Sequence, residues 1–407
     1  MGRQIDTKNV VGRDELISRI WEMLRRPPEQ GSLRFTAERR VGKTTVMTKM
    51  AADHPEDFDV LFLEVEGIST CQSFAELLLN RMRPFLQKKE KAQKWFVDFL
   101  TGLRGTEIAG VIKLPETNDL GWQTIFLKAI DGFCQNREDR TILIMLDELP
   151  YMLQKIEQVS SKAGKPHEAL TLVDTLRALR QSHRNLRMIF AGSVGLHHVL
   201  RDLKQDKLAS QPFNNMELVE IKPLNEEHAL ILATELAKTQ ILKIEAKNRK
   251  EILKRIVELS SRVPFYIERI ISRLGLLGRS ITVADVDDLV QEHLTSDRDP
   301  WEMDHFRSRL VTYYAGSLID ANGKTIPEHQ IARAVLDHFA CTEDPQTIEQ
   351  VWQIIRGQYP LTDRKIIVDM LKFLAQDHYL ETDSQKQYSF RFPLIKRWWK
   401  IAQGLES

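Results

Sequence analysis

Hydrophobic and polar positions follow two different periodicities along this chain. In the first part, short runs that are apolar at nearly every position are separated by segments whose apolar residues recur three or four positions apart. Such runs predict strands buried on both faces, and the segments between them predict amphipathic helices. The predicted strands lie at 33–36, 59–66, 140–147, 185–196 (with its polar end) and 216–221. Strands that alternate with helices indicate an α/β fold with a parallel sheet core.

After residue 222 the hydrophobic residues have helical periodicity. Helices are predicted at 225–236, 248–262 and 263–274. Beyond about residue 300, three more helices (329–339, 347–356 and 363–376) are followed by two short alternating segments around a polar turn. Three helices and a hairpin predict a winged helix. We therefore expect a core at 1–222, a helical domain at 223–299 and a winged-helix domain at 300–407.

Residues 87–120 interrupt the core pattern and predict an insertion. The segment contains an amphipathic helix, KKEKAQKWFVDFLTGL, and then the alternating run TEIAGVIKLP. Its aromatic residues Trp95, Phe96 and Phe99 are expected to contact the core; a surface for a partner is the alternative. In the helix before the insertion, Ser73 and Glu76 have the spacing of a capping box.

Composition limits the class of protein without identifying it. The chain has 407 residues, 42% of them hydrophobic and 28% charged, with a net charge of +1. Because the chain is nearly neutral, its net charge gives no reason to expect binding to nucleic acid or to an anionic membrane. Cys71, Cys134 and Cys341 lack metal-ligand spacing and are expected to be reduced. No run approaches the ~18 apolar residues of a membrane span, and the expected location is cytoplasmic.

The segment TAERRVGKTT, at 36–45, joins a predicted strand to a helix that begins at Lys43. Backbone N–H groups of such a loop and of the helix N-terminus converge on one spot and can hold a polyphosphate. In the pattern G-x-x-x-x-G-K-[ST], the lysine reaches the terminal phosphates and the hydroxyl, here Thr44, ligates Mg²⁺. The predicted nucleotide-binding residues here are Ala37, Arg39, Arg40, Val41, Gly42, Lys43, Thr44 and Thr45.

One position departs from this pattern, because Ala37 replaces the first glycine. Alanine disfavours positive φ, so the loop must enter through an ordinary backbone angle or lie differently over the phosphates. A chance Gly-Lys-Thr at a helix start is the alternative interpretation. The strand before the loop and the helix after it favour phosphate binding.

A second signal is the segment ILIMLDELP, at 142–150, where an apolar strand ends in Asp147 and Glu148. The carboxyl edge of a parallel sheet is where ligands of open α/β sheets bind. In a P-loop protein, the first acid holds Mg²⁺ and the second orients the attacking water. Acids commonly close strands, so the segment alone would be weak evidence. Its position after a P-loop makes it much stronger.

Six motifs, in this order along the chain, together resemble the prokaryotic AAA+ ATPases of the STAND and origin-initiator-like group that end in a winged helix. They are VVGRDEL (10–16), TAERRVGKTT (36–45), ILIMLDELP (142–150), AGSVGL (191–196), RVPFY (262–266) and FPLIKRWW (392–399). The resemblance implies ATP or ADP and Mg²⁺ as ligands, and a helical lid at 223–299. It further implies a homo-oligomer or a partner protein.

The resemblance also suggests roles for residues outside the two main motifs. Val11 and Gly12 would contact the adenine, although the helix after them could simply pack on the sheet. Ser193 would sense the γ-phosphate, with a plain turn as its alternative. Pro264 would belong to a Gly-x-Pro element of the lid, in which the glycine is missing around Ser261. The resemblance gives weaker support for two arginines. Arg262 would be a nucleotide sensor or a solvated charge at a helix end. Arg201 would be an arginine finger donated across a subunit interface.

Three functions remain open at this point. The first is an ATP-driven, slowly hydrolysing switch in which Lys43, Glu148 and Ser193 are catalytic and Thr44 and Asp147 hold the metal. The second is a DNA-binding factor that uses the winged helix. The third is a non-catalytic scaffold whose nucleotide is structural.

The C-terminal region bears on the DNA alternative. Residues 301–407 contain 13 Lys and Arg against 14 Asp and Glu, and a DNA-binding winged helix usually has a basic stripe. These charges are therefore at least as consistent with packing inside the protein, or with a protein partner, as with DNA binding. Trp398 and Trp399 could stack on bases, but they more often anchor a terminal helix to its own domain.

Overall fold

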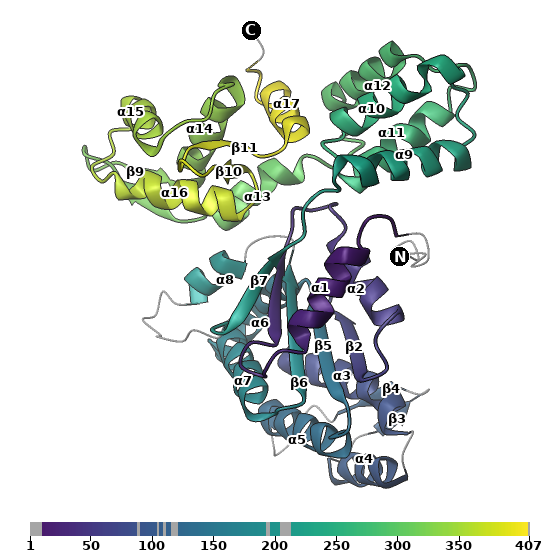
Figure 1. Cartoon of the computed structure of the whole chain (residues 1–407). Coiled ribbons are helices and arrows are strands. Elements are labelled where there is room, and N and C mark those ends of the chain that lie inside the picture. The colour runs from purple at the N-terminus through teal and green to yellow at the C-terminus, as the bar shows by residue number, and fades with distance from the viewer. Residues whose placement is uncertain are drawn as a thin grey trace. The chain divides into compact units, whose positions relative to one another are not determined.

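The computed structural model describes residues 10–87, 90–103, 106–108, 111–114, 121–192, 196–203 and 213–405. Contacts divide the chain into two compact units, Met1–Ile221 and Lys222–Ser407. Figure 1 shows the helices and strands of both units.

The first unit is built on a five-stranded sheet whose strand pairs are all parallel, in the order β2-β5-β6-β1-β7. The central strands β5 and β6 and the edge strand β2 are buried at nearly every position. This burial explains why their sequences are continuous apolar runs. The α/β fold with a parallel sheet is confirmed. The strands are β1 Ser32–Thr36, β2 Phe58–Glu64, β5 Thr141–Asp147, β6 Leu186–Gly192 and β7 Met216–Glu220.

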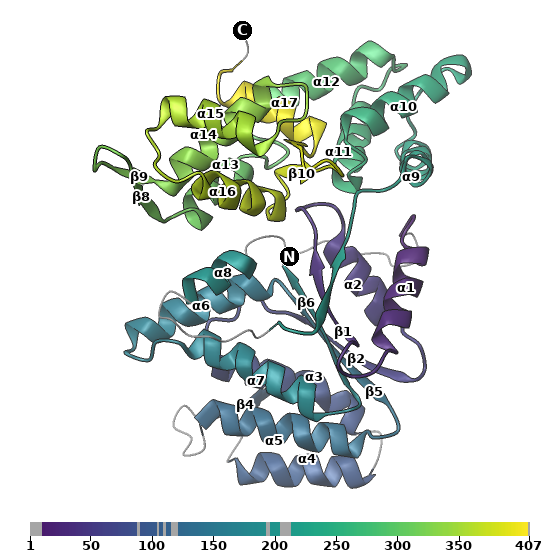
Figure 2. The same ribbon diagram turned by 60° about the vertical axis from the view of Figure 1, so that its left-hand side comes forward.

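Helices cover both faces of this sheet (Figures 1 and 2). The connection from β1 to β2 crosses the sheet in the opposite direction from the later connections. Because such crossovers are right-handed, its helix α2 (Lys43–Ala52) lies on the other face from theirs. Helix α1 (Asp14–Leu24) lies beside α2. The second face carries α3 Cys71–Leu86, α5 Gly121–Asn136, α6 Leu149–Lys162 and α7 Glu168–Ser182, which share one hydrophobic core with the strands.

The insertion forms helix α4 (Glu90–Gly102) and the antiparallel strands β3 (Thr106–Ile108) and β4 (Val111–Lys113). Phe96 is buried, and Trp95 stacks on Phe99 with ring centroids 5.4 Å apart. Trp95 also lies against Gly132 of α5, where an added Cβ would come within 1.8 Å of the indole. The prediction that these aromatic residues contact the core is confirmed.

The predicted capping box at Ser73 and Glu76 is wrong. Helix α3 begins earlier, and its N-cap is Thr70, whose hydroxyl accepts a hydrogen bond from the Ser73 backbone N–H. The Glu76 carboxylate instead accepts a hydrogen bond from the Leu114 N–H at 2.9 Å. One turn later, the Asn80 side chain accepts from the Ile112 N–H at 2.9 Å. Polar side chains of α3 therefore hold the insertion in place.

The second unit begins with four helices: α9 Glu226–Thr239, α10 Arg249–Leu259, α11 Pro264–Gly275 and α12 Val283–Thr295. Their starts follow local capping rules. Asn225 caps α9, and Thr282 and Asp285 form a capping box at α12. Helix α11 begins with Pro264 in its first turn, where a missing N–H is not needed.

The rest of the unit contains helices and two short hairpins. The Ser261 hydroxyl accepts a hydrogen bond from the Leu394 N–H at 3.0 Å and so joins the turn before α11 to the start of α17. A buried network fixes the interior: Tyr314 donates to Asp377 at 2.7 Å, and Arg309 lies 4.1 Å from the Tyr379 ring centroid. The elements are α13 His305–Tyr313, β8 Ser317–Ile319, β9 Thr325–Pro327, α14 Glu328–Cys341, α15 Ile348–Gln358, α16 Lys365–Gln376, β10 Leu380–Thr382, β11 Tyr388–Phe390 and α17 Pro393–Ala402.

The two C-terminal tryptophans anchor helix α17 to this unit. Both are buried, and the Trp399 indole N–H donates to Asp337 Oδ1 at 2.8 Å. The anchoring interpretation is confirmed, and the faces of these rings are not exposed for stacking on bases.

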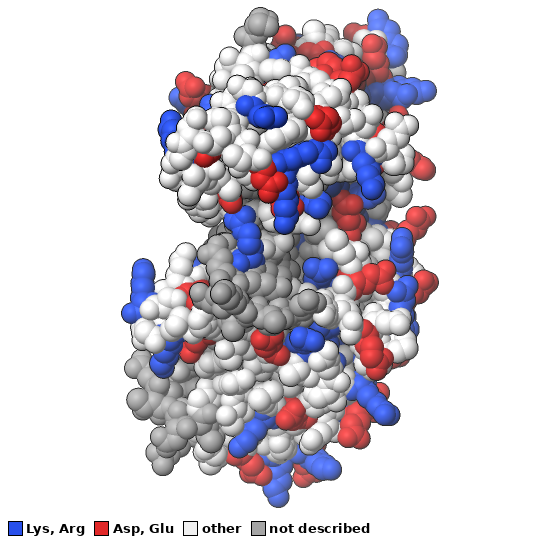
Figure 3. Space-filling view, turned by 90° about the vertical axis from the view of Figure 1, so that its left-hand side faces the viewer, with Lys and Arg blue, Asp and Glu red and all other residues white. Residues whose placement is uncertain are grey.

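The described helices include none with the length and apolar character needed to cross a membrane. On the face drawn in Figure 3, basic and acidic side chains are interspersed, as the near-neutral net charge suggests.

Candidate functional site

The loop between β1 and α2 depends on left-handed backbone angles. Gly42, the N-cap of α2, has φ +105°, and Arg40 has φ +73°. A β-carbon at Gly42 would be strained at that angle. Ala37 is buried, and among the described residues it is not one of those with positive φ. The loop therefore enters through an ordinary backbone angle, which explains how alanine is accommodated where the motif has glycine.

Arg13 fixes this loop from the N-terminal side. Its guanidinium Nη2 donates a hydrogen bond to the Val41 carbonyl oxygen at 2.8 Å, and both residues are buried. Burial lowers the pKa of Arg13 from its usual value to about 10. Gly12, with φ +70°, makes the turn that precedes Arg13.

Four side chains of the two main motifs meet at the carboxyl edge of the sheet. Lys43 Nζ lies 2.8 Å from Glu148 Oε1 and 3.2 Å from Asp147 Oδ1. The Thr44 hydroxyl donates to Asp147 Oδ2 at 2.6 Å. Residues that are more than a hundred positions apart in the sequence thus form one cluster, because β1 and β5 are separated only by β6 in the sheet.

The acidic turn, formed by Asp147 and Glu148, is held in place by its backbone and by neighbouring strands. Glu148 has φ +60° and is the N-cap residue of α6, so its carboxylate is directed by a left-handed backbone angle. The Asp147 carbonyl accepts a hydrogen bond from the Val65 N–H at 3.1 Å. Pro150, in the first turn of α6, packs on Gly192 at the end of β6, where an added Cβ would lie 2.5 Å from its ring. Neighbouring strand ends therefore position both acids.

The donor set fits Mg²⁺ and a polyphosphate. A hydroxyl and a carboxylate are hard oxygen ligands of the kind that Mg²⁺ takes, and they lie side by side at Thr44 and Asp147. The α2 N-terminus and the lysine supply positive charge for phosphate groups. The cluster brings two carboxylates and one ammonium together in a largely buried site, which favours a further cation.

The other predicted site residues are placed as follows. Thr45 follows Thr44 in the first turn of α2, and the segment containing Val11 and Gly12 lies next to the loop through Arg13. Arg39 is exposed and Arg40 partly exposed within the loop. Ser193 lies outside the described residues, directly after the end of β6. Pro264 lies in the second unit, and its predicted role stays a prediction.

The roles suggested for Arg262 and Arg201 stay predictions. Arg262 is exposed, and it and Ser261 both have positive φ, at 61° and 51°. These are the angles that a glycine would adopt most easily. Arg201 lies in helix α8 (Leu196–Leu203).

Sequence reasoning missed three supporting residues. Arg13 was part of a recognised motif, but the sequence gives no sign that it bonds a carbonyl 28 positions away. Glu38 is buried in the loop and accepts a hydrogen bond from the Arg39 N–H at 2.6 Å. The one sequence signal for Gly192 is that a predicted strand ends in glycine, which indicates a close approach by another segment, here Pro150.

Comparisons with known proteins show similarity at the level of structure alone. No protein-family model and no curated protein matches the sequence. The Walker-type ATPase Paby2304 of Pyrococcus abyssi matches with a TM-score of 0.61 and 13% identity, over 97% of both chains. Cdc6p from Pyrobaculum aerophilum (TM-score 0.43, 11% identity, 99% of this chain and 96% of that one) and the Thermotoga maritima RuvB Holliday junction branch migration motor (0.37, 11%, 93% and 92%) are more distant. The chain therefore has the fold of a Walker-type P-loop ATPase.

Proposed function

We propose that this protein binds ATP with Mg²⁺ and hydrolyses it slowly, as a switch of the AAA+/STAND type. The observation that carries the proposal is the meeting of Lys43, Thr44, Asp147 and Glu148 at one edge of the sheet. Lys43 would contact the terminal phosphates, and Thr44 and Asp147 would hold Mg²⁺. Glu148 would orient the attacking water. Bound Mg²⁺ would compensate charge on the phosphate oxygens.

The contacts of Lys43 support this assignment. Its side chain is buried and lies between two carboxylates that the nucleotide and metal would otherwise engage. A buried ammonium needs compensating charge, and both acids supply it here. Movement of Lys43 Nζ toward a phosphate would free Asp147 for the metal and Glu148 for water.

Two substitutions test the proposal. Lys43→Ala is expected to abolish ATP binding, because it removes the point charge and leaves the charge of two acids uncompensated by the lysine beside the phosphates. Glu148→Gln is expected to retain binding and to lower turnover by about 10²- to 10⁴-fold, the usual effect of losing a positioned base. Calorimetric titration with ATP and a phosphate-release assay measure the two effects separately.

Each variant has a matched control. Lys49→Ala removes a lysine from the same helix that pairs with Asp14 and Asp53 instead of the acidic turn. Glu64→Gln alters an exposed acid at the end of β2, in register with Asp147. Both controls should bind and hydrolyse ATP normally. Full activity in Lys43→Ala and Glu148→Gln would end the proposal.

We further propose that residues 223–299 act as a lid and residues 300–407 as a winged helix that engages a partner according to nucleotide state. Helices α9 to α12 support the first part, and α14 to α16 followed by the β10–β11 hairpin support the second. A protein partner is favoured over DNA, because Trp398 and Trp399 are buried and the net charge of residues 301–407 is close to zero.

A further inference from the structure

Strand β2 forms one edge of the five-stranded sheet. It pairs with β5 along all seven of its residues, and no described strand pairs with its other side. A cavity of about 520 Å³ borders the strand, and Phe62 and Phe85 are only partly buried in its wall. The lining comes from the end of α2, from β2 and from the second half of α3: Ala51, Val60, Leu61, Phe62, Glu64, Asn80, Arg81, Pro84 and Phe85.

The hydrogen bonds to β5 determine which backbone groups of β2 point outward. At the start of the strand, the Thr141 N–H donates to the Asp57 carbonyl at 2.9 Å. At its end, the Val65 N–H donates to the Asp147 carbonyl at 3.1 Å. Backbone groups alternate in direction along a strand, so the odd-numbered residues of β2 face β5. The even-numbered residues direct their N–H and C=O groups away from the sheet.

Three of these outward-facing residues are available to another strand. Phe58, the first of the even-numbered residues, uses both of its backbone groups within the chain. The next three are Val60, Phe62 and Glu64, and the described part of the chain supplies no hydrogen-bond partner for their outward groups. All three line the cavity. The open edge therefore presents three donors and three acceptors in a row.

The sequence of β2 does not protect this edge. Natural edge strands are commonly short, or carry Lys or Pro, which discourages pairing with another chain. β2 has seven residues, FDVLFLE, with neither Lys nor Pro. Its first acid, Asp59, is buried and paired with Arg137 at 2.6 Å, so it puts no charge on the edge. By contrast, the opposite edge strand β7 has five residues, MELVE, two of them acids.

The available positions are symmetric about Phe62, and a second copy of the same strand matches this symmetry. In an antiparallel pair with Phe62 opposite its own counterpart, Val60 lies opposite Glu64 of the other copy. Each of these three pairs exchanges two backbone hydrogen bonds, which uses all the available groups of both strands. Leu61 then falls opposite Leu63, and the two Phe62 rings form a cross-strand aromatic pair. A strand of a different protein would need no such symmetry.

We propose that two copies of this chain join through their β2 edges, antiparallel and related by a two-fold axis beside Phe62. The sheet of one copy continues into the sheet of the other, and the same residues contribute from both sides. The contact goes beyond the nucleotide-dependent switch proposed above, because β2 contributes no residue to the phosphate loop or to the acidic turn.

Sedimentation of the full chain over a range of concentrations tests the pairing. Without nucleotide, we expect a mass twice the 47.2 kDa of the chain. Lys43→Ala should give the same mass, so the dimer can be judged even if the proposed ATP binding fails. A monomer at every concentration would overturn the proposal and leave the edge to a strand of another protein.

A charge at the axis tests the location of the contact. Phe62→Lys places like charges opposite each other and should weaken the dimer at least about tenfold. Leu218→Lys adds the same charge to the opposite edge strand, at a side chain that is 57% exposed, and is the control that should dimerise normally. Equal dimerisation of the two variants would contradict pairing through β2.

Disulfide formation tests the register without relying on a loss of association. Hydrogen-bonded antiparallel partners have Cα atoms about 5.5 Å apart, within the range of a disulfide. With the exposed Cys341 replaced by serine, Phe62→Cys should cross-link to its counterpart under mild oxidation. Glu64→Cys is the matched control and should stay uncross-linked, because its counterpart lies about 13 Å further along the strand. Failure of Phe62→Cys to cross-link, or equal cross-linking of both variants, would overturn the proposal.

Discussion

At the residue scale, Arg13 shows how a buried charge can position a phosphate loop. Its guanidinium is removed from water, which lowers its pKa, and it donates a hydrogen bond to the Val41 carbonyl. A buried arginine is retained at such a position when its donors satisfy buried backbone oxygens. The Val41 carbonyl is one of these, and it directly precedes Gly42, whose φ of +105° suits glycine and no other residue.

Arg13→Ala is expected to destabilise the protein and to weaken ATP binding. Loss of the donor leaves the buried Val41 carbonyl unsatisfied, a penalty of about 1–3 kcal/mol in the free energy of unfolding. We expect the loosened loop to lose about tenfold in affinity for ATP. Denaturant unfolding and calorimetric titration measure the two effects.

The control for this prediction is Arg19→Ala, which removes an exposed arginine from the next turns of α1. It should leave both quantities unchanged. An Arg13→Ala protein that binds ATP as tightly as the natural one would show that the loop holds its shape without this contact.

At the element scale, the start of α6 and the end of β6 depend on each other. The Pro150 ring occupies the space over Gly192, so the helix that begins at the acidic turn can lie directly on the sheet. Any side chain at position 192 would push the turn outward.

Gly192→Ala is expected to impair catalysis more than folding. The new Cβ would lie 2.5 Å from Pro150 Cγ, so the turn that carries Asp147 and Glu148 must shift. Overpacking of this kind typically costs about 1–3 kcal/mol. We expect a fall in ATP turnover of at least ~10-fold, in line with the sensitivity of catalysis to misplaced groups.

Gly67→Ala provides the matched comparison, because an added Cβ at Gly67 meets nothing within 4 Å. Its turnover and its denaturant midpoint should both match those of the natural protein. Equal turnover in the two variants would mean that the contact between Pro150 and Gly192 does not position the acids.

The elements also show where prediction from sequence succeeds and where it stops. Strands β2, β5 and β6 could be predicted because strands covered on both faces must be apolar at almost every position. The cap of α3 was assigned to the wrong residues because several Ser and Thr residues compete for one N-cap, and side-chain spacing alone does not choose between them. The partner of Glu76 lies 38 positions away, beyond the reach of any local pattern.

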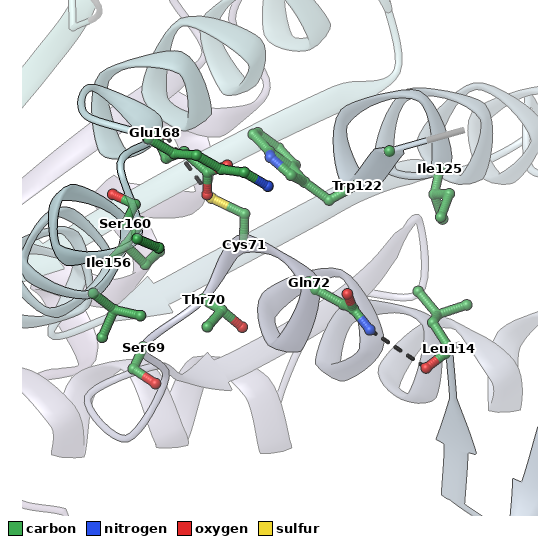
Figure 4. A pocket seen from close by; sticks show the side chains of 14 residues that line it. Ser69, Thr70, Cys71, Gln72, Leu114, Trp122, Ile125, Ile156, Ser160 and Glu168 are labelled. Carbon is green, nitrogen blue, oxygen red and sulfur yellow. Dashed lines mark hydrogen bonds between the residues drawn. The ribbon is translucent and has the colours of Figure 1, made fainter. Parts of the chain in front are cut away.

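At the scale of the whole molecule, the sequence specified more of the first unit than of the second. The order β2-β5-β6-β1-β7 brings the phosphate loop and the acids together, and the two motifs predicted that meeting correctly. A cavity of about 310 Å³ in the first unit (Figure 4) could not be foreseen, because its walls come from helices α3, α5, α6 and α7 and from the insertion. In the second unit, the helices were predictable but their joining through Ser261 and Leu394 was not.

The whole molecule is expected to assemble into oligomers when ATP is bound. With Mg²⁺ and an unhydrolysable ATP analogue, the mass in solution should be a multiple of the 47.2 kDa chain and larger than with ADP. Lys43→Ala should show no such difference, because it lacks the ligand. Mass determination by light scattering after size separation makes the comparison. Identical masses with both nucleotides would contradict assembly as the output of the switch.

The contact of Lys43 with both acids has a consequence for the order in which ligands enter. While the lysine ammonium compensates one of the two carboxylates, a lone divalent cation would have to displace it to reach both acids. A bound triphosphate would change this balance, since it would draw the ammonium toward itself and expose the acids in the same motion. Metal and nucleotide are thus expected to arrive as one complex, and the lysine is expected to hold the position of the ion whenever the site is empty.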